Sequence, residues 1–521
     1  MRATSAAPGL EITVDGTLLT PAAHAAIASV RVSRRLSQPA QCEVAFVADP
    51  AVVAGSHVAF AVPIGARLAV AVTGDQGSLF EGEVTGQEWC HESDGAAELR
   101  VRAYDPLHRL RKHQRVVGRT DVTLADLAGE LAGIAGIGTK VDAQGPRWPV
   151  LVQHRQDDLE LLQEVAEGQG LWFGVVDGDL RLFTLEGIGE AVELVLHQNL
   201  PAARFDATAE PACRSVQALG WDPVTARGVE AEASDPRSGR DTPARTAPDI
   251  VGGDGERFLA GHLAPGPDHL EAAAQAELDR RVAGEVTFSG TALGDARLHP
   301  GRPVRVAGTH SSVTGTYVLT RTVHTLDAAG YRTELDTAPP ARSTPAAATT
   351  ATLGEVTSAD DPDRLGRVRV TLPAFAGVET DWREVVSIGA GAGKGLVALP
   401  DTGDRVLVLL PAGDPAAAVV LGGLFGDTAP DDAGLEAGAV KRWSLLTGGG
   451  QRVVLDDDKG RIVLANRDGS TIELAPERVT VHAAADLTIE APGATMTLRA
   501  NRIELVQATS AEDPPEPPGA A

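Results

Sequence analysis

The sequence predicts a mainly β, multidomain protein with a few helices, and three observations carry this prediction. The chain has 521 residues, enough for three or four domains, because one domain usually takes roughly 100–200 residues. Gly (57) and Pro (33) make up about 17% of the chain, above the usual ~12%, as expected for many short strands joined by turns. A hydrophobic content of 43% supplies enough apolar side chains for several cores and excludes extensive disorder.

The first 337 residues show both strand and helix patterns. Leu124, Leu127 and Leu131 lie on one face of an amphipathic helix, for which Thr120 or Asp121 is the expected cap. The predicted helices cover residues 121–132, 157–168 and 268–282. The predicted strands lie around residues 44–46, 68–72, 99–104, 171–176, 180–184 and, repeatedly, within 285–337.

Turn and linker signals divide this part of the chain further. Asp177-Gly178 is typical of a tight hairpin turn between the two strands that flank it. Residues 225–265 are rich in Ala, Asp, Arg, Gly and Pro without periodicity, which predicts a long surface excursion. Residues 338–350 form a Pro/Ala/Thr linker, the clearest domain boundary in the chain.

Residues 351–426 predict a small barrel of the OB type, because five strand patterns follow one another closely. The five patterns cover residues 366–372, 382–388, 395–399, 404–410 and 418–422. The most apolar stretch of the chain, residues 406–425, is broken by Asp414-Pro415. It therefore predicts strand, turn and strand rather than a membrane span.

A connector, residues 427–444, leads to an internal repeat over residues 445–507, and a Pro/Glu-rich tail, residues 508–521, follows. Apolar–x–apolar triplets recur about every eight residues, with turn residues between them. The triplets are Val453/Leu455, Ile462/Leu464, Ile472/Leu474, Val479/Val481, Leu487/Ile489, Met496/Leu498 and Ile503/Leu505. Each unit predicts one short strand, too small to be stable alone.

The alternation within the repeat predicts how the units associate. The opposite face is polar, with Thr471, Glu473, Thr480, Thr488, Glu490, Thr497 and Glu504. A single chain would leave a thin meander with one open apolar side, whereas three chains around a common axis would bury the apolar pairs and close the sheet edges. We therefore expect a triple-stranded β-prism or β-helix needle in a homotrimer, with an antiparallel meander packed on the barrel as the alternative.

Several separated motifs resemble the VgrG and phage baseplate assembly protein V spike family. In the barrel, the motifs include Gly354-Glu-Val-Thr, Asp361-Pro362, Gly366-Arg-Val-Arg-Val, Trp382-Arg383, Gly391-Ala-Gly393, Leu399-Pro400, Gly403-Asp404 and Gly413-Asp414-Pro415, in the family's order. In the N-terminal part, the segments 103–110, 153–162, 170–173, 288–301, 304–306 and 315–324 are similar to the family's hub domain.

The resemblance implies a trimeric central spike of a contractile injection machine. Residues 1–337 would be the hub, with two β-barrel-like subdomains and helical insertions, and would cap the inner tube. The OB barrel would lie beneath it, and the needle would pierce the target membrane and carry a small PAAR-type protein at its end. The implied partners are two further copies, inner-tube, hub and baseplate proteins, and this tip protein. A phage tail, a type VI secretion system and an extracellular particle all remain open.

An enzyme is the main alternative, as a lytic spike with cell-wall hydrolase activity. The residues between barrel and needle are too few to fold independently as a catalytic domain. Gly389-Ala-Gly-Ala-Gly-Lys-Gly395 lacks the spacing of a phosphate-binding loop or a dinucleotide fingerprint, so a barrel loop is expected. The sequence also contains no H-E-x-x-H or G-x-S-x-G motif. We expect no catalytic residue and no cofactor, and a monomeric adhesin-like β protein remains a third hypothesis.

Metal binding is not expected either. His482 should point away from the needle axis, because Val479 and Val481 point toward it. Asp456-Asp-Asp458 lacks the continued spacing of a calcium loop and predicts a solvated corner. Lys441-Arg442 beside Trp443 is expected to form a collar at the root of the needle, too small to recognise nucleic acid.

Charge and cysteine content exclude further classes of function. The net charge of −25, from 46 Lys+Arg and 71 Asp+Glu, argues against nucleic acid and anionic membrane surfaces as partners. Cys42, Cys90 and Cys213 have no zinc or disulfide spacing and are expected to be free, buried thiols. The first five residues lack the apolar core of a signal peptide. We therefore expect cytoplasmic synthesis, assembly into a particle, and no transmembrane segment.

Overall fold

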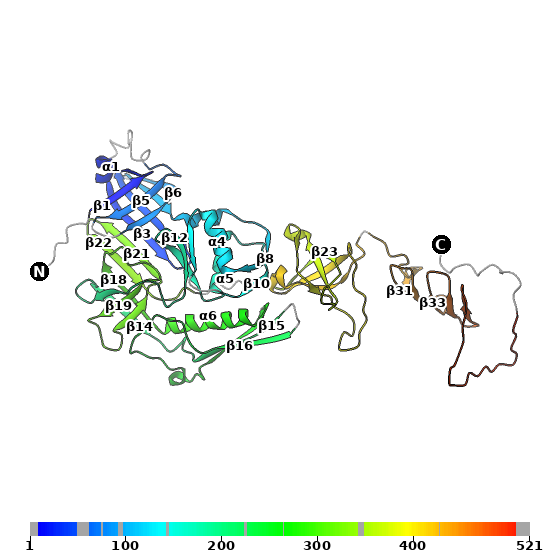
Figure 1. Ribbon diagram of the computed structural model, residues 1–521. Coiled ribbons are helices and arrows are strands. Elements are labelled where there is room, and N and C mark those ends of the chain that lie inside the picture. The colour runs from blue at the N-terminus through cyan, green and yellow to red at the C-terminus, as the bar shows by residue number, and fades with distance from the viewer. Residues whose placement is uncertain are drawn as a thin grey trace. The chain divides into compact units, whose positions relative to one another are not determined.

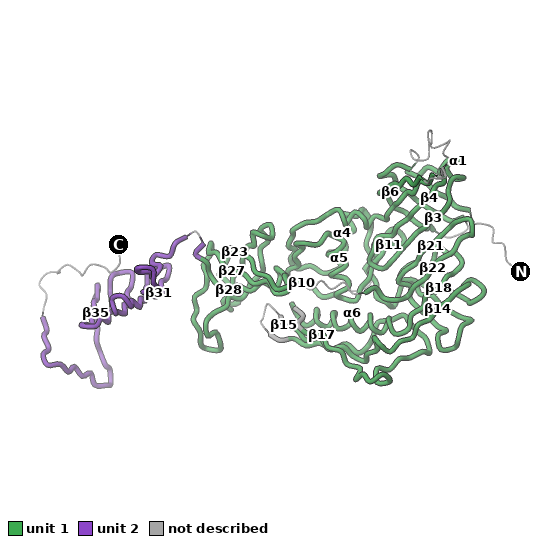
Figure 2. The backbone as a smooth tube through the Cα atoms, turned by 180° about the vertical axis from the view of Figure 1, so that it is seen from behind, with its two compact units in different colours: residues 1–424 green, residues 425–521 purple. Residues whose placement is uncertain are grey.

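A computed structural model describes residues 9–48, 62–73, 77–91, 97–141, 145–222, 227–263, 265–341, 348–426 and 428–506. The chain divides into two compact units, unit 1 (residues 1–424) and unit 2 (residues 425–521) (Figure 2). The expected N-terminus without a signal peptide and the tail at residues 508–521 lie outside the described residues.

An 11-stranded sheet forms the largest part of unit 1. It joins strands from the start of the chain to strands almost 300 residues later through the antiparallel pair β3–β21, in which Arg35 lies opposite Arg321. Figure 1 shows these blue and green strands side by side. In spatial order the strands are β14 (Ala202–Ala207), β18 (Val286–Leu293), β22 (Gly330–Asp336), β21 (Arg321–Asp327), β3 (Ile27–Arg35), β4 (Gln41–Ala48), β7 (Ala97–Tyr104), β6 (Ser78–His91), β5 (Arg67–Val72), β1 (Leu10–Val14) and β2 (Thr17–Leu18).

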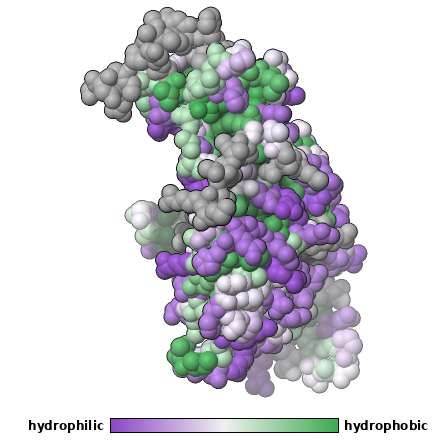
Figure 3. All heavy atoms as spheres, turned by 90° about the vertical axis from the view of Figure 1, so that its left-hand side faces the viewer, coloured by the Kyte–Doolittle hydropathy of each residue, from purple (hydrophilic) through white to green (hydrophobic). Residues whose placement is uncertain are grey.

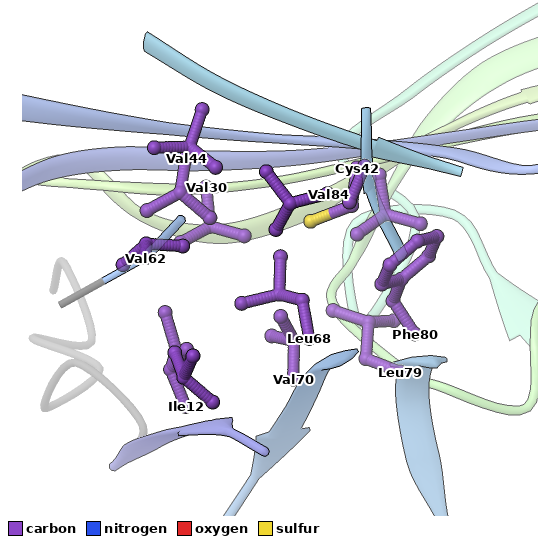
Figure 4. Close-up of a cluster of buried hydrophobic side chains, with 14 of the residues drawn as sticks. Ile12, Val30, Cys42, Val44, Val62, Leu68, Val70, Leu79, Phe80 and Val84 are labelled. Carbon is purple, nitrogen blue, oxygen red and sulfur yellow. The ribbon is translucent and has the colours of Figure 1, made fainter. Parts of the chain in front are cut away.

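Alternation along these strands separates a core face from a solvent face. On β4, Cys42, Val44 and Phe46 are buried, as period-two alternation predicts for a half-buried strand. They pack with Leu68 and Phe80 in the cluster of Figure 4. A second core surrounds β18, β19 (Pro303–Ala307), β20 (Gly315–Val318) and β13 (Val192–Val195). On the face of unit 1 in Figure 3, hydrophilic residues cover most of the middle, and apolar residues form separate groups.

Two helices and two small sheets form a third core. Leu124, Leu127 and Leu131 are fully buried, as predicted. The cap differs from the prediction: Thr123, not Thr120 or Asp121, accepts from the backbone N–H of Asp126, and Asp126 accepts from that of Thr123. The elements are η1 (Pro106–Lys112), α4 (Leu124–Ala135), α5 (Asp158–Glu167), β8 (Val117–Thr123), β9 (Gly138–Val141), β10 (Arg147–Gln153), β11 (Trp172–Val176) and β12 (Asp179–Phe183).

The hairpin β11–β12 and the later helix confirm two further predictions. Asp177 and Gly178 have φ of 53° and 81°, which are the values a two-residue turn between strands requires. The helix α6 (Pro267–Glu285) covers the predicted residues 268–282 and packs through Leu270, Ala274 and Leu278.

The prediction of an irregular excursion at residues 225–265 is wrong in two places. β16 (Arg227–Ala233) and β17 (Glu256–Leu263) flank β15 (Ser215–Asp222) in a 3-stranded sheet that contacts α6. β16 contributes Val229, Ala231 and Ala233 to this core, so small alanines weaken its strand pattern, whereas β17 carries Phe258 and Leu259 side by side rather than in alternation. Between β16 and β17, the only regular element among the described residues is the short turn η2 (Pro248–Val251).

The barrel region carries its core on three long strands. Val356, Val368, Val370, Val406 and Val408 are almost fully buried. Two predictions here are wrong: β23 was not among the predicted strands, and residues 395–399 form no strand but belong to an exposed hairpin. The observed elements are β23 (Thr350–Ser358), β24 (Arg367–Leu372), η3 (Pro373–Phe375), β25 (Val378–Glu379), β26 (Arg383–Glu384), β27 (Arg405–Leu410), η4 (Pro411–Gly413), η5 (Pro415–Ala417) and β28 (Val419–Gly423).

Unit 2 is a 5-stranded antiparallel meander in which each strand pairs with the next along the chain. A two-stranded hairpin, β29 (Leu435–Glu436) and β30 (Ala439–Val440), precedes it. The meander strands are β31 (Arg442–Leu446), β32 (Arg452–Asp456), β33 (Arg461–Ala465), β34 (Thr471–Leu474) and β35 (Val479–His482). Residues 483–506 contain no strand. The remaining short helix of the described chain is α1 (Pro21–Ala25).

Candidate functional site

The candidate site is the apolar face of the meander in unit 2. Its strands pair in such a register that the predicted triplets lie directly opposite one another. The first row across the sheet is Trp443, Leu455, Ile462, Leu474 and Val479. The second row is Leu445, Val453, Leu464, Ile472 and Val481. Aligned apolar pairs of this kind are the unit by which a sheet stabilises one face.

These two rows are exposed in the single chain. Val453 is half-buried, and every other member is between 41% and 73% exposed. The opposite face has the reverse distribution, because Val463 is 4% and Asp456 3% exposed. A contiguous, exposed apolar surface is uncommon on a soluble chain and marks an interaction site.

The opposite face is stabilised by charge pairs. Arg461 lies between Asp456 and Glu473, at 3.5 Å and 3.1 Å. At the root of the sheet, Arg442 pairs with Asp432 at 2.7 Å, and this hydrogen bond lowers the pKa of Asp432 to about 2. The charged groups thus occupy one face and leave the other face wholly apolar.

The last three triplets do not belong to the sheet. Leu487, Ile489, Met496, Leu498, Ile503 and Leu505 are all more than half exposed and lie in residues without a strand. Leu487 nevertheless reaches the second row and, with Val453, Leu464 and Val481, helps to line a hollow of about 500 Å³. The place of the last three triplets in a needle core therefore remains a prediction.

Two residues of the face were missed by sequence reasoning, which began the repeat at Val453. Trp443 pairs with Leu455 and Leu445 with Val453, so β31 is the first strand of the face. The signal was present, since Trp443-Ser-Leu445 is itself an apolar–x–apolar triplet. Trp443 is 73% exposed and belongs to the face rather than to a basic collar.

The residues considered for metal binding do not lie among the two apolar rows. His482 lies opposite Thr471 and follows Val481, so it falls on the face opposite the apolar rows, as predicted. Asp456 accepts from the backbone N–H of Lys459 and pairs with Arg461. Among the described residues, no group of three or more His, Cys, Asp and Glu side chains is arranged to hold a metal ion.

The free cysteines differ in their burial. Cys42 and Cys213 are buried and Cys90 is half-buried, and none forms a disulfide. Burial raises the pKa of the Cys42 and Cys213 thiols above the usual range, which keeps them protonated and unreactive.

Within the cores of unit 1, burial also changes the pKa values of two histidines. His324 is fully buried in β21; its Nε2 lies 2.9 Å from the Leu298 carbonyl oxygen and its Nδ1 3.0 Å from the Tyr331 hydroxyl. Desolvation lowers the pKa of His324 to about 3 and that of His299 to about 4. Both rings are therefore neutral at physiological pH, with Nε2–H of His324 as a donor.

Comparison with known families decides which class of protein this geometry belongs to. Residues 33–330 match the family of the phage tail baseplate hub (GPD). The chain belongs to this baseplate hub family. Residues 352–425 of the hub protein also match the type VI secretion system/phage-baseplate injector OB domain. No curated protein matches the whole sequence closely enough to be recognised as a relative.

Solved structures place the fold with the VgrG spikes. A chain of the half-lidded Francisella PdpA-VgrG complex is 8% identical, with a TM-score of 0.53 over 91% of this chain and 87% of that chain. A chain of the lidded Francisella PdpA-VgrG complex is 9% identical, with a TM-score of 0.52 over 91% of this chain and 79% of that chain. The E. coli c3393 protein is 13% identical, with a TM-score of 0.50 over 80% of this chain and 99% of that chain. It is described as a type VI secretion component similar to T4 bacteriophage tail proteins gp27 and gp5.

These findings confirm the predicted resemblance and the mainly β fold with an OB domain. The hub protein therefore combines a phage tail baseplate hub region with a type VI secretion system/phage-baseplate injector OB domain. Among the described residues, no helix combines the length and apolar character needed to cross a membrane.

Proposed function

We propose that three copies of this hub protein associate through the apolar rows of unit 2 and form the needle of an injection spike. Residues 1–337 cap the inner tube, residues 351–426 form the OB barrel, and the needle at residues 445–507 pierces the target membrane. A PAAR-type protein occupies the needle end. In this role the spike is not an enzyme; it transmits the force of the moving tube to a small area of membrane.

The observation that carries this proposal is the exposed, in-register apolar face of β31–β35. Fully burying one Val, Leu or Ile side chain contributes about 1.5–3 kcal/mol. The two rows leave much of this contribution unused in the single chain, since most members are at least two-fifths exposed. Association of copies through this face recovers it, at the entropic cost of bringing the chains together.

The shape of the sheet favours three copies over two. Both outer edges of the meander, on β31 and β35, lack a strand partner among the described residues. Three such sheets around one axis bury the apolar faces toward the centre and pair the free edges, whereas two stacked sheets leave edges open. The triplets beyond β35 then extend the same prism with strands that pair between chains.

The segment between barrel and meander supports a structural role over the lytic alternative. Among its described residues, 428–441, the hairpin β29–β30 is the only regular structure. This length is well below the roughly 40 residues that an independently folded domain usually needs. Membership of the baseplate hub family supports the proposal that inner-tube and baseplate proteins are the partners.

Solution mass tests the trimer directly. We expect light scattering of the full chain to give about three times 53.9 kDa. Val481→Asp should abolish the trimer, because three carboxylates would be buried at the axis without partners, which costs several kcal/mol. Thr480→Asp is the matched control, since Thr480 is the preceding residue on the opposite face, and it should remain trimeric. A monomeric wild type, or a trimeric Val481→Asp variant, would disprove the axial face.

A further inference from the structure

A second exposed apolar feature lies on the barrel, within unit 1. Residues 386–399, called the arm here, leave the barrel after β26 and return before β27. Ile388 is 79%, Val397 85% and Val386 57% exposed, and Leu396 and Leu399 are also exposed. From residue 388 to residue 399 every position is exposed.

The arm is nonetheless an ordered hairpin. The backbone N–H of Leu396 donates to the carbonyl of Ile388 at 3.0 Å, and Gly391 and Lys394 exchange two backbone hydrogen bonds of 3.1 Å. The Ser387 hydroxyl also donates to the carbonyl of Leu396. Gly393, with φ of 70°, supplies the left-handed turn residue that such a tight hairpin requires. The structure thus holds five exposed apolar side chains on a fixed backbone.

The composition of the arm indicates a protein contact rather than a solvated loop. Lys394 is its only charged residue, although 22% of the whole chain is charged. Loops exposed to water are usually polar, whereas a depletion of charge with exposed aliphatic residues is typical of the centre of an interface. Lys394 at the tip has no ion pair with any described residue of its own chain.

The surroundings of the arm indicate which kind of partner covers it. The backbone N–H of Val386 donates to the carbonyl of Val420 at 2.8 Å, so the base of the arm lies beside β28. Leu421 on β28, and Leu424 and Phe425 directly after it, are exposed as well. The exposed apolar residues are therefore not confined to the arm, because they recur in sequence from β28 to residue 425.

We propose that the arm packs against the OB barrel of a second copy of this chain and locks the three barrels into a collar. This inference rests on the proposed trimer: three needles on one axis hold three barrels together through the short connector at residues 426–441, so each arm has a neighbouring barrel within reach. The exposed carboxylates of Asp401 and Asp404 on that neighbour offer Lys394 an opposite charge.

Photocrosslinking in mixed trimers tests the collar. The photoreactive residue p-benzoylphenylalanine replaces Val397, and chains grown with ¹⁴N and ¹⁵N are unfolded, mixed, refolded and irradiated. We expect two-chain products whose crosslinked peptides pair a light with a heavy partner from residues 352–425. The same photoreactive residue at Glu379, an exposed position of β25 at the opposite end of the barrel sheet from β28, is the matched control and should lose most of this product.

The outcomes separate this inference from the proposed function. Trimers of the expected mass whose residue 397 crosslinks only within its own chain, or not at all, overturn the collar and leave the needle intact. A monomeric mass overturns both.

A second measurement does not depend on the photoreactive residue. Ile388→Ser with Val397→Ser should lower the denaturant midpoint at which the trimer dissociates. Ile250→Ser, at a position 75% exposed in η2, should not shift this midpoint. An unchanged midpoint in the arm variant would also contradict the collar.

Discussion

At the scale of single residues, His324 shows how burial without charge compensation makes a hub core sensitive to acid. The ring is fully buried, and the Leu298 carbonyl and the Tyr331 hydroxyl satisfy its two nitrogens in the neutral form. A second proton would remove the acceptor at Nδ1 and bury a charge. The folded core therefore holds His324 neutral down to a pKa of about 3.

The pH dependence follows from this lowered pKa. An unfolded chain takes up a proton at His324 near pH 6.5, but the folded chain does not until about pH 3. The contribution to stability is therefore complete above about pH 6.5 and is lost as the pH falls, by about 2 kcal/mol at pH 5. His324→Gln removes the titrating group, so the stability gap between wild type and variant should shrink by that amount between pH 7.5 and 5.

Denaturant unfolding followed at both pH values measures this gap. His310→Gln is the control, because His310 is exposed and its side chain belongs to no buried core among the described residues, so its stability gap should be small. A His324→Gln gap that stays constant from pH 7.5 to 5 would show that the buried ring is not protonated on unfolding.

At the scale of elements, helix α4 offers a sharp test because its observed cap differs from the expected one. Thr123→Ala removes the acceptor for the backbone N–H of Asp126, which should cost about 1 kcal/mol. Thr120→Ala is the matched control, since Thr120 is an exposed residue of β8 outside the cap. Thermal or urea unfolding of unit 1 measures both, and an equal loss in the two variants would contradict the observed cap.

The same elements show where sequence reasoning succeeded and where it could not. Period-two triplets predicted β32 to β35 because local alternation of Val, Ile and Leu is itself the signal. β16 was missed because alanines take much of its core face, and β17 was missed because its pairing with β15 joins residues about 40 positions apart. Residues 395–399 have strand composition, but no described strand of the same chain pairs with them.

At the scale of the whole molecule, the motifs in residues 103–110 and 354–425 sufficed to predict the family, because they appear in order over most of the chain. The number of copies could not be read in the same way. A single sequence records which side chains are apolar, whereas the partner that covers them depends on how complete sheets fit together.

Removing unit 2 tests which part of the molecule drives association. Unit 1 has its own hydrophobic cores, so a chain ending at residue 424 should fold. It should be monomeric at micromolar concentration, because without the needle the barrels lose the high effective concentration that a tether provides. Sedimentation velocity measures this. A stable trimer of the shortened chain would show that the needle face is not the main source of association.

The order of strands in unit 2 has a consequence for the kinetics of assembly. Every pair in β31–β35 joins neighbours along the chain, so each sheet can form hairpin by hairpin within microseconds to milliseconds. In the proposed trimer, docking of three finished sheets is instead a collision between molecules, whose rate depends on concentration. During that waiting time each chain carries an open apolar sheet with free edges, the species most prone to aggregate. The yield of spikes in the cell should then depend on synthesis of many copies close together, and not on the folding speed of one chain.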